Sequence, residues 1–331
     1  MKISYKDSGV DIDAGIEAVK KIKDIVKETF VPNVLTDIGA FGGCFEFPVR
    51  QYKRPVLVSS ADGVGTKLIV ANMMNRHDTI GQCLVNHCVN DILTTGAQPL
   101  FFLDYIGLGK LRPDVVVNIV RGLVIACKEN SCSLVGGEMA EMPGIYQNKE
   151  FDLVGTIVGV VEREQMLPRN IQAGDVLIGL WSSGLHTNGY SLARNVLLKH
   201  HKVDDYIEEL GAVLGDVLLK IHRSYLPIIK PFLGNTDLHG ISHITGGGIE
   251  GNTSRILPDG MKLEVDWDAW KWLPIFSYIQ SRGDIATEEM RRVFNLGIGL
   301  ILIVEKNAVG YFVELLKKSR EYPVVLGLIN N

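Results

Sequence analysis

Carboxylates beside glycine-rich turns are the first residues of this chain with a chemical meaning. Asp62 opens the run Asp62-Gly63-Val64-Gly65-Thr66-Lys67, which follows a predicted buried strand at residues 55–60. Two glycines let backbone N–H groups approach an anion at the start of the next helix, and Lys67 adds a positive charge. The run matches neither GxxxxGK[ST] nor GxGxxG. It therefore predicts either a phosphate-binding turn with Asp62 as a magnesium ligand, or a structural strand-to-helix turn.

A second polar pair, Asn90-Asp91, falls within a helix predicted over residues 78–95. An amide beside a carboxylate is typical of oxygen ligands for a hard cation, and equally of a solvated helix face. His87 lies one turn before Asp91, and we expect it to pack or to contact the site from outside rather than to bind a metal. The motif alone leaves both interpretations open.

A third acidic motif, Gly136-Gly137-Glu138, follows a strand predicted at residues 132–135. Asp62, Asp91 and Glu138 thus all lie at the ends or flanks of predicted buried elements, which surface solubility does not require. Magnesium held by carboxylates and nucleotide phosphates is the simplest interpretation of this convergence.

Two polar loops in the second half of the chain could hold an anion. The first contains His186-Thr187-Asn188, and the second contains His243 followed by Thr245-Gly246-Gly247-Gly248. Each precedes a predicted helix, whose backbone N–H groups attract phosphate, although each could instead serve only to cap that helix.

The composition excludes several classes of protein. The chain has 331 residues, 46% hydrophobic and 22% charged, with a net charge of −4, so it is globular and has no basic excess for binding nucleic acid. We expect no secretory signal, no membrane-spanning segment and a cytoplasmic location. Its five cysteines show no metal spacing, and buried free thiols are the expected state.

The elements that position these motifs alternate between helix and strand. Length predicts two domains, and a polar stretch with Pro168 and Gly174 places the boundary between residues 168 and 169. Apolar spacing predicts the following main elements: helices at 13–29, 78–95, 115–124, 214–232, 249–257, 275–281 and 309–317, and strands at 55–60, 100–105, 132–135, 151–161, 176–180, 261–265, 300–304 and 324–328. The fold class is α/β or α+β.

Eight motifs in order resemble those of the phosphoribosylformylglycinamidine cyclo-ligase (AIR synthase) family. The motifs are residues 5–13, 62–67, 88–92, 101–105, 136–144, 182–192, 243–248 and 294–299. The resemblance covers nearly the whole chain. It implies a homodimer, with an N-terminal half (residues 1–168) that binds ATP and builds the central sheet structure of the dimer, and an α/β C-terminal half (residues 169–331).

The resemblance also implies an activity. ATP with Mg²⁺ would phosphorylate the formamide oxygen of formylglycinamidine ribonucleotide, a substrate nitrogen would close the imidazole ring, and phosphate would leave. The implied metal ligands are Asp62, Asp91 and Glu138, and the implied catalytic residues are Asp62, Lys67, Asp91 and His186. The implied nucleotide contacts are Gly63, Val64, Gly65, Thr66, Lys67, Asn90, Gly136, Gly137 and Glu138. The implied substrate contacts are His186, Thr187, Asn188, His243, Thr245, Gly246, Gly247 and Gly248.

The chain departs from the family at three places. Ala61 and Met139 stand where the family usually has threonine, and Ile221-His222-Arg223 stands where it usually has Pro-Thr-Arg. These differences leave open two other functions. One is another phosphotransferase of the same superfamily, such as a thiamine-phosphate kinase, and the other is a nucleotide-binding protein without catalysis.

Overall fold

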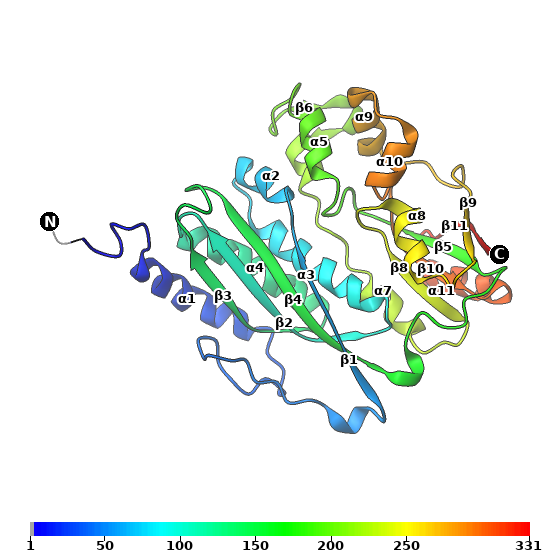
Figure 1. The fold of residues 1–331 in the computed structure, drawn as a ribbon, viewed down its shortest axis with the longest axis horizontal. Coiled ribbons are helices and arrows are strands. Elements are labelled where there is room, and N and C mark those ends of the chain that lie inside the picture. The colour runs from blue at the N-terminus through cyan, green and yellow to red at the C-terminus, as the bar shows by residue number, and fades with distance from the viewer. Residues whose placement is uncertain (1–2) are drawn as a thin grey trace.

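Two β-sheets organise the chain (Figure 1). The structure is a computed structural model that describes residues 3–331. The first sheet has the order β1-β4-β2-β3 and the second has the order β8-β10-β5-β11-β9, while β6 and β7 form a separate pair. The bounds of the strands are β1 (Pro55–Gly63), β2 (Gln98–Leu108), β3 (Ser133–Glu141), β4 (Phe151–Glu162), β5 (Val176–Trp181), β6 (Tyr206–Ile207), β7 (Ala212–Val213), β8 (Leu238–His243), β9 (Lys262–Val265), β10 (Ile298–Val304) and β11 (Val324–Asn330).

Helices cover both sheets, so the predicted mixture of helix and strand is confirmed in each half (Figure 1). Their bounds are α1 (Ile12–Lys27), α2 (Lys67–Met73), α3 (Asp78–Leu93), α4 (Pro113–Glu129), α5 (Tyr190–Leu197), α6 (Leu214–Leu218), α7 (Leu226–Ile229), α8 (Gly248–Thr253), α9 (Pro274–Gly283), α10 (Thr287–Val293) and α11 (Val309–Lys318). Among residues 3–331 no helix combines the length and the apolar character needed to cross a bilayer.

Helix α3 is the most enclosed element of the fold. Thirteen of its sixteen residues are buried, because the first sheet and α4 pack on it and residues 222–225 of the second half contact it as well. Asn90 is fully buried. The interpretation of Asn90-Asp91 as a solvated helix face is therefore wrong for Asn90, whose amide must find its hydrogen bonds inside the protein.

Three local predictions need correction. Strand β3 does not end at Val135 but continues to Glu141, because its parallel pairing with β2 continues through the two glycines. The helix predicted at 214–232 is instead the short helices α6 and α7 with non-helical residues between them. Finally, all five cysteines are free thiols as expected, but Cys44 is exposed.

The contact between α3 and α4 requires two glycines. A Cβ atom on Gly81 would lie 2.2 Å from the carbonyl oxygen of Ile119, and one on Gly122 would lie 2.0 Å from that of Asp78. Both distances are far inside van der Waals contact, so the backbones of the two helices touch directly at these points.

We predict that Gly122→Ala lowers the free energy of unfolding by about 1–3 kcal/mol, because α3 and α4 must separate to admit the methyl group. Urea denaturation measures the change. The matched control is Gly310→Ala in the exposed part of α11, where a Cβ meets nothing within 4 Å. This control should raise stability by about 0.5–1 kcal/mol. Equal effects of the two variants would contradict the close packing of the helices.

Candidate active site

Asp62 and Asp91 lie together around His87. Asp62 faces α3 from β1, and its Oδ2 atom is 2.9 Å from His87 Nε2. Asp91 Oδ2 is 3.8 Å from the same nitrogen and accepts a hydrogen bond of 3.0 Å from Ser60 Oγ. The Asp62 and Asp91 side chains are 44% and 26% exposed, so solvent and ligands can reach these carboxylates. His87 therefore contacts both carboxylates directly instead of supporting the site from outside.

A series of hydrogen bonds runs from His87 through the second half of the chain and back to Asp91. His87 Nδ1 is 2.7 Å from Thr187 Oγ1, which is 3.3 Å from His222 Nδ1. His222 Nε2 is 3.0 Å from His243 Nε2, and His243 Nδ1 is 2.8 Å from Asp91 Oδ1. The two predicted substrate residues Thr187 and His243 are thus connected to the two predicted metal ligands.

The ionisation of these groups follows from burial and from their partners. Burial alone would raise the pKa of Asp62, but the hydrogen bond and charge of His87 hold that pKa below its usual value. Asp91 shows the same balance, with His243 as the partner that lowers its pKa. Burial opposes a charge on His87, yet Asp62 and Asp91 together raise its pKa. The site is therefore a pair of carboxylates that share one imidazole as partner.

His186 and His222 form a stacked pair behind these carboxylates. Their ring centroids are 4.0 Å apart with an interplanar angle of 19°. Burial, assisted by the neighbouring histidines, lowers the pKa of both rings well below the usual value, so both are neutral near pH 7. His186 Nε2 accepts a hydrogen bond of 3.2 Å from the Ser183 N–H, and its Nδ1 atom is buried without a partner among the described residues.

Lys67 is fully buried, which corrects the prediction of a lysine available as a point charge. Its ammonium donates to the carbonyl oxygens of Lys220 (2.6 Å) and His186 (3.0 Å) and to Cys83 Sγ (3.1 Å). An ammonium has three N–H donors, and these three contacts account for them. Contact with a transferred phosphoryl group would require one of these bonds to be exchanged. In the structure Lys67 positions the loop that contains His186.

The predicted turn at residues 63–66 is formed and lies against the second half. Gly65 has a φ of +64°, in the left-handed region that favours glycine. Thr66 Oγ1 is 3.1 Å from Ser191 Oγ on α5, and Val64 is completely buried. Because contacts on both sides hold the turn, it presents a fixed backbone next to Asp62.

Glu138 does not join the other two carboxylates within one chain. Asp62 pairs with Gly155, which pairs with Asp104, which pairs with Gly137, so three strand spacings separate Asp62 from β3. At about 4.8 Å per spacing this is roughly 14 Å. The Glu138 side chain accepts a hydrogen bond of 2.8 Å from the Met139 N–H. A single metal cluster of Asp62, Asp91 and Glu138 is therefore not formed by this chain alone.

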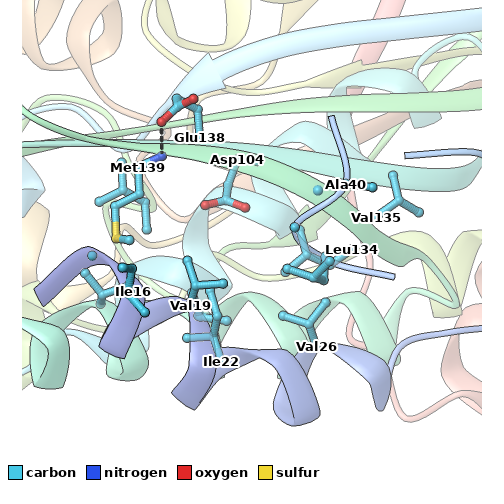
Figure 2. A pocket seen from close by; sticks show the side chains of 18 of the residues that line it. Ile16, Val19, Ile22, Val26, Ala40, Asp104, Leu134, Val135, Glu138 and Met139 are labelled. Carbon is cyan, nitrogen blue, oxygen red and sulfur yellow. Dashed lines mark hydrogen bonds between the residues drawn. The ribbon is translucent and has the colours of Figure 1, made fainter. Parts of the chain in front are cut away.

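Gly136 and Gly137 line a cavity of about 480 Å³ between α1 and the first sheet (Figure 2). Apolar side chains of α1, including Ile16, Val19 and Ile22, form one wall. Asp104 points from the sheet toward α1, and Glu138 lies on the opposite side of the strands (Figure 2). Burial raises the pKa of Asp104 to about 7. The cavity is thus mainly apolar, and Asp104 and Glu138 are the carboxyl residues in its lining.

The two predicted substrate loops adjoin each other. A Cβ atom on Gly246 would lie 3.4 Å from Asn188 Oδ1. The Asn252 side-chain amide donates to the carbonyl oxygens of Thr245, Gly246 and Gly248, the last at 2.7 Å. These bonds fix the shape of the glycine loop, so its residues have a structural role. Their contact with a substrate stays a prediction.

Comparison with known proteins identifies the family. The models of the N-terminal and C-terminal domains of AIR synthase related proteins match residues 48–161 and 172–331. Phosphoribosylformylglycinamidine cyclo-ligase of Alkaliphilus oremlandii is 46% identical over 99% of this chain and 97% of its own. The enzyme of that name from Pseudothermotoga lettingae is 48% identical, also over 99% and 97%. The chain belongs to the AIR synthase family.

The fold of this AIR synthase family member also occurs in more distant proteins. The crystal structure of thiamine-monophosphate kinase from Stenotrophomonas maltophilia superimposes with a TM-score of 0.69, covering 94% of this chain and 93% of that one at 17% identity. At this identity the likeness concerns the fold alone. The domain division between residues 168 and 169 stays a prediction.

Polar residues of α3 join the two halves, and Asn86 among them was not singled out from the sequence. Asn90 Nδ2 donates to the Arg223 carbonyl (2.8 Å), and Asn90 Oδ1 accepts from the Tyr225 N–H (3.0 Å). Asn86 Nδ2 donates to the His222 carbonyl (2.8 Å). The available signal was the presence of Asn86, His87 and Asn90 among the apolar residues of this helix. They hold residues 222–225 in a non-helical conformation.

We predict that Asp104 makes stability depend on pH. Its folded-state pKa of about 7 exceeds the ordinary value of 3.8, so between about pH 4 and 7 the folded protein holds a proton that the unfolded chain has lost. The free energy of unfolding therefore decreases as pH rises through this range. Urea unfolding of Asp104→Asn should show a gain in stability over the wild type that grows from pH 4 to pH 7. A difference that is constant with pH would contradict the buried carboxyl.

Proposed function

We propose that the protein catalyses the ATP-dependent cyclisation of formylglycinamidine ribonucleotide to 5-aminoimidazole ribonucleotide, with release of ADP and phosphate. The observation that carries the proposal is the full-length similarity to enzymes named phosphoribosylformylglycinamidine cyclo-ligase, at 46–48% identity. The arrangement of Asp62 and Asp91 beside the two substrate loops supports it, because a phosphorylating enzyme needs a cation site next to the acceptor.

Asp62 and Asp91 are the proposed ligands of the divalent cation that accompanies ATP. They support such a role because both are ionised and open to solvent, and because both lie beside His87. The cation would neutralise phosphate charge. The backbone of residues 63–66 would contact the nucleotide, as would Gly136, Gly137 and Glu138 from the far end of the sheet.

The loops that contain His186-Thr187-Asn188 and residues 245–248 would hold the ribose phosphate and place the amine against the activated carbon. Placement of this kind can lower the activation barrier by up to about 7–11 kcal/mol. His186 is neutral, and its buried Nδ1 atom has no hydrogen-bond partner among the described residues. In this proposal Lys67 acts by positioning the His186 loop. Five free thiols favour the cytoplasmic location that belongs to the proposal.

We predict that Asp91→Asn lowers the rate of ADP release with formylglycinamidine ribonucleotide by about 100-fold or more, because the carboxylate charge that holds the cation is lost. A coupled ADP assay measures the rate, and circular dichroism checks the fold. Asp268→Asn, on the exposed loop after β9, is the matched control and should retain full turnover. Near-normal turnover of Asp91→Asn would remove Asp91 from the cation site.

The same assay separates the proposal from its two alternatives. Formylglycinamidine ribonucleotide, thiamine phosphate and buffer alone are compared with the wild-type protein. Stimulation of ADP release by thiamine phosphate only would favour a kinase. Tight ATP binding without turnover on either substrate would favour a binding protein.

The proposal includes a homodimer formed through the outer face of the first sheet. On this face Leu57, Ser59 and Ala61 of β1 are exposed, and the residues paired with the latter two, Val158 and Thr156 of β4, are partly exposed. The helices α3 and α4 pack on the other face. A sheet face that carries Leu57 at 62% exposure and a partly exposed valine is typical of a surface that pairs with a second copy.

We predict that Leu57→Glu converts a dimer into a monomer in size-exclusion chromatography with light scattering, because the pairing would bury its charge. Ile125→Glu is the control, since Ile125 is 51% exposed on α4, on the side of the sheet that the helices cover. A dimer that withstands Leu57→Glu and dissociates with Ile125→Glu would place the interface on the helices instead.

A further inference from the structure

His222 contacts three of the residues that the sequence predicts as substrate contacts. Its ring is fully buried. Its Nδ1 atom lies 3.3 Å from Thr187 Oγ1, and its Nε2 atom lies 3.0 Å from His243 Nε2. One face of the ring stacks on His186, with ring centroids 4.0 Å apart and an interplanar angle of 19°. A single side chain therefore contacts both predicted substrate loops, through its two nitrogens and through one face.

The strands that carry the two loops are not neighbours in the second sheet. One loop follows β5, and the other begins at the end of β8. Strand β10 lies between them and is antiparallel to both, so the loops leave the same edge of the sheet two strand spacings apart. At about 4.8 Å per spacing this is roughly 10 Å. The loops adjoin at Gly246 and Asn188, and His222 adds a second connection from a third segment of the chain.

Strand β10 provides the space for this group of rings by carrying a glycine. A Cβ atom on Gly299 would lie 2.1 Å from the Tyr225 hydroxyl oxygen and 2.6 Å from His186 Cε1. Both distances are too short for any side chain. The rings therefore pack directly on the backbone of β10.

Helix α3 fixes the backbone of His222. The His222 N–H donates to Cys83 Sγ at 3.3 Å, and the His222 carbonyl oxygen accepts from Asn86 Nδ2 at 2.8 Å. The Asn90 amide donates to the next carbonyl oxygen, that of Arg223, at 2.8 Å. Because side chains of α3 satisfy these backbone groups, the His222 ring projects from a fixed point. It therefore connects the position of α3 to the position of both loops.

The orientation of the rings favours a positioning role over metal binding. The lone pair of an imidazole nitrogen lies in the plane of its ring. The planes of His186 and His222 are within 19° of parallel and are stacked at 4.0 Å. Lone pairs of stacked parallel rings do not converge on one point, so these two rings and His243 do not surround an ion in this arrangement.

We propose that His222 is a positioning residue that holds His243 and the Thr187 loop at a fixed separation and thereby sets the affinity for formylglycinamidine ribonucleotide. The inference rests on the proposed function, in which both loops hold this substrate. The sequence departs from the family at this position, where threonine is usual, so the connection distinguishes this chain. A threonine side chain offers one hydroxyl, whereas an imidazole offers two nitrogens and an aromatic face.

The test compares His222→Leu with the wild-type full-length protein. Leucine fills much of the space of the ring and makes neither polar contact. We expect the KM for formylglycinamidine ribonucleotide to rise about tenfold or more, with kcat and the KM for ATP changed less than about threefold, because His222 acts on binding and not on the reacting atoms. Steady-state ADP release measures these constants, and calorimetry measures the Kd of the substrate.

His222→Gln provides a conservative rescue, since its amide lies near the position of Nε2 and can contact His243. It should recover most of the lost affinity. An unchanged substrate KM in the folded variants, with only the amount of active enzyme reduced, would overturn the proposal.

His239→Gln is the matched control, because His239 is a buried histidine of β8 whose ring contacts Asp175. It should lose stability in urea and keep the KM of the wild type. An increase in KM as large as that of His222→Leu would assign the effect to the loss of any buried histidine and would overturn the proposal.

A double-mutant cycle with Thr187→Val tests the connection itself. If His222 acts through Thr187, the second substitution should change the substrate Kd by less than the same substitution does alone. Full additivity of the two effects would overturn the proposed connection.

The same measurements separate this inference from the proposed function. A wild-type protein that turns over formylglycinamidine ribonucleotide, with His222 variants of unchanged KM, would overturn the role of His222 and leave the function intact. A wild-type protein that binds this substrate without cyclising it would overturn the function, and a Kd weakened in His222→Leu and restored in His222→Gln would still support the positioning role.

Discussion

A polar side chain that folding removes from water must find its hydrogen bonds inside the protein, and helix α3 meets this constraint by binding the second half of the chain. The side-chain amides of Asn86 and Asn90 form hydrogen bonds with the backbone of residues 222–225, and the His87 ring forms one with Thr187. The helix cannot satisfy these groups alone, because the first sheet covers its other side. The position of the second half, and hence of both predicted substrate loops, follows from this requirement.

The proposed catalytic arrangement depends on the same helix. Asp91 projects from α3 toward Ser60 on the sheet and toward His243 at the end of β8. The Asp91 carboxylate therefore contacts both halves of the molecule. Asp62 on β1 is the second carboxylate beside His87. Lys67 adds a second connection, since its ammonium binds backbone carbonyls of two separate second-half segments. Residues that the sequence analysis selected for phosphate chemistry therefore also hold the two halves of the chain together.

Hydrophobic spacing predicted most of the elements, because a buried strand or an amphipathic helix has a local signature. The Asp62 turn and the Asn90-Asp91 pair were also recognisable from the sequence, because the residues of each motif occupy consecutive positions. Residues 219–225 were not, because their conformation depends on acceptors and donors of α3 that lie more than a hundred positions away in the chain. The separation of Glu138 from Asp62 was equally hidden, since it depends on the order of strands in the sheet. His222 could be noted as unusual, but its partner His243 is known only from the fold.

The exposure of Cys44 has a practical consequence for experiments on this enzyme. The other four thiols are buried, so a thiol-directed fluorophore or spin label would attach at one place without any mutation. The neighbouring residue Gly43 packs on Val135, and Ala40 of the same segment lines the cavity beside Gly136 and Gly137. A probe on Cys44 would therefore report on how this segment covers the cavity, in a protein with no substitution.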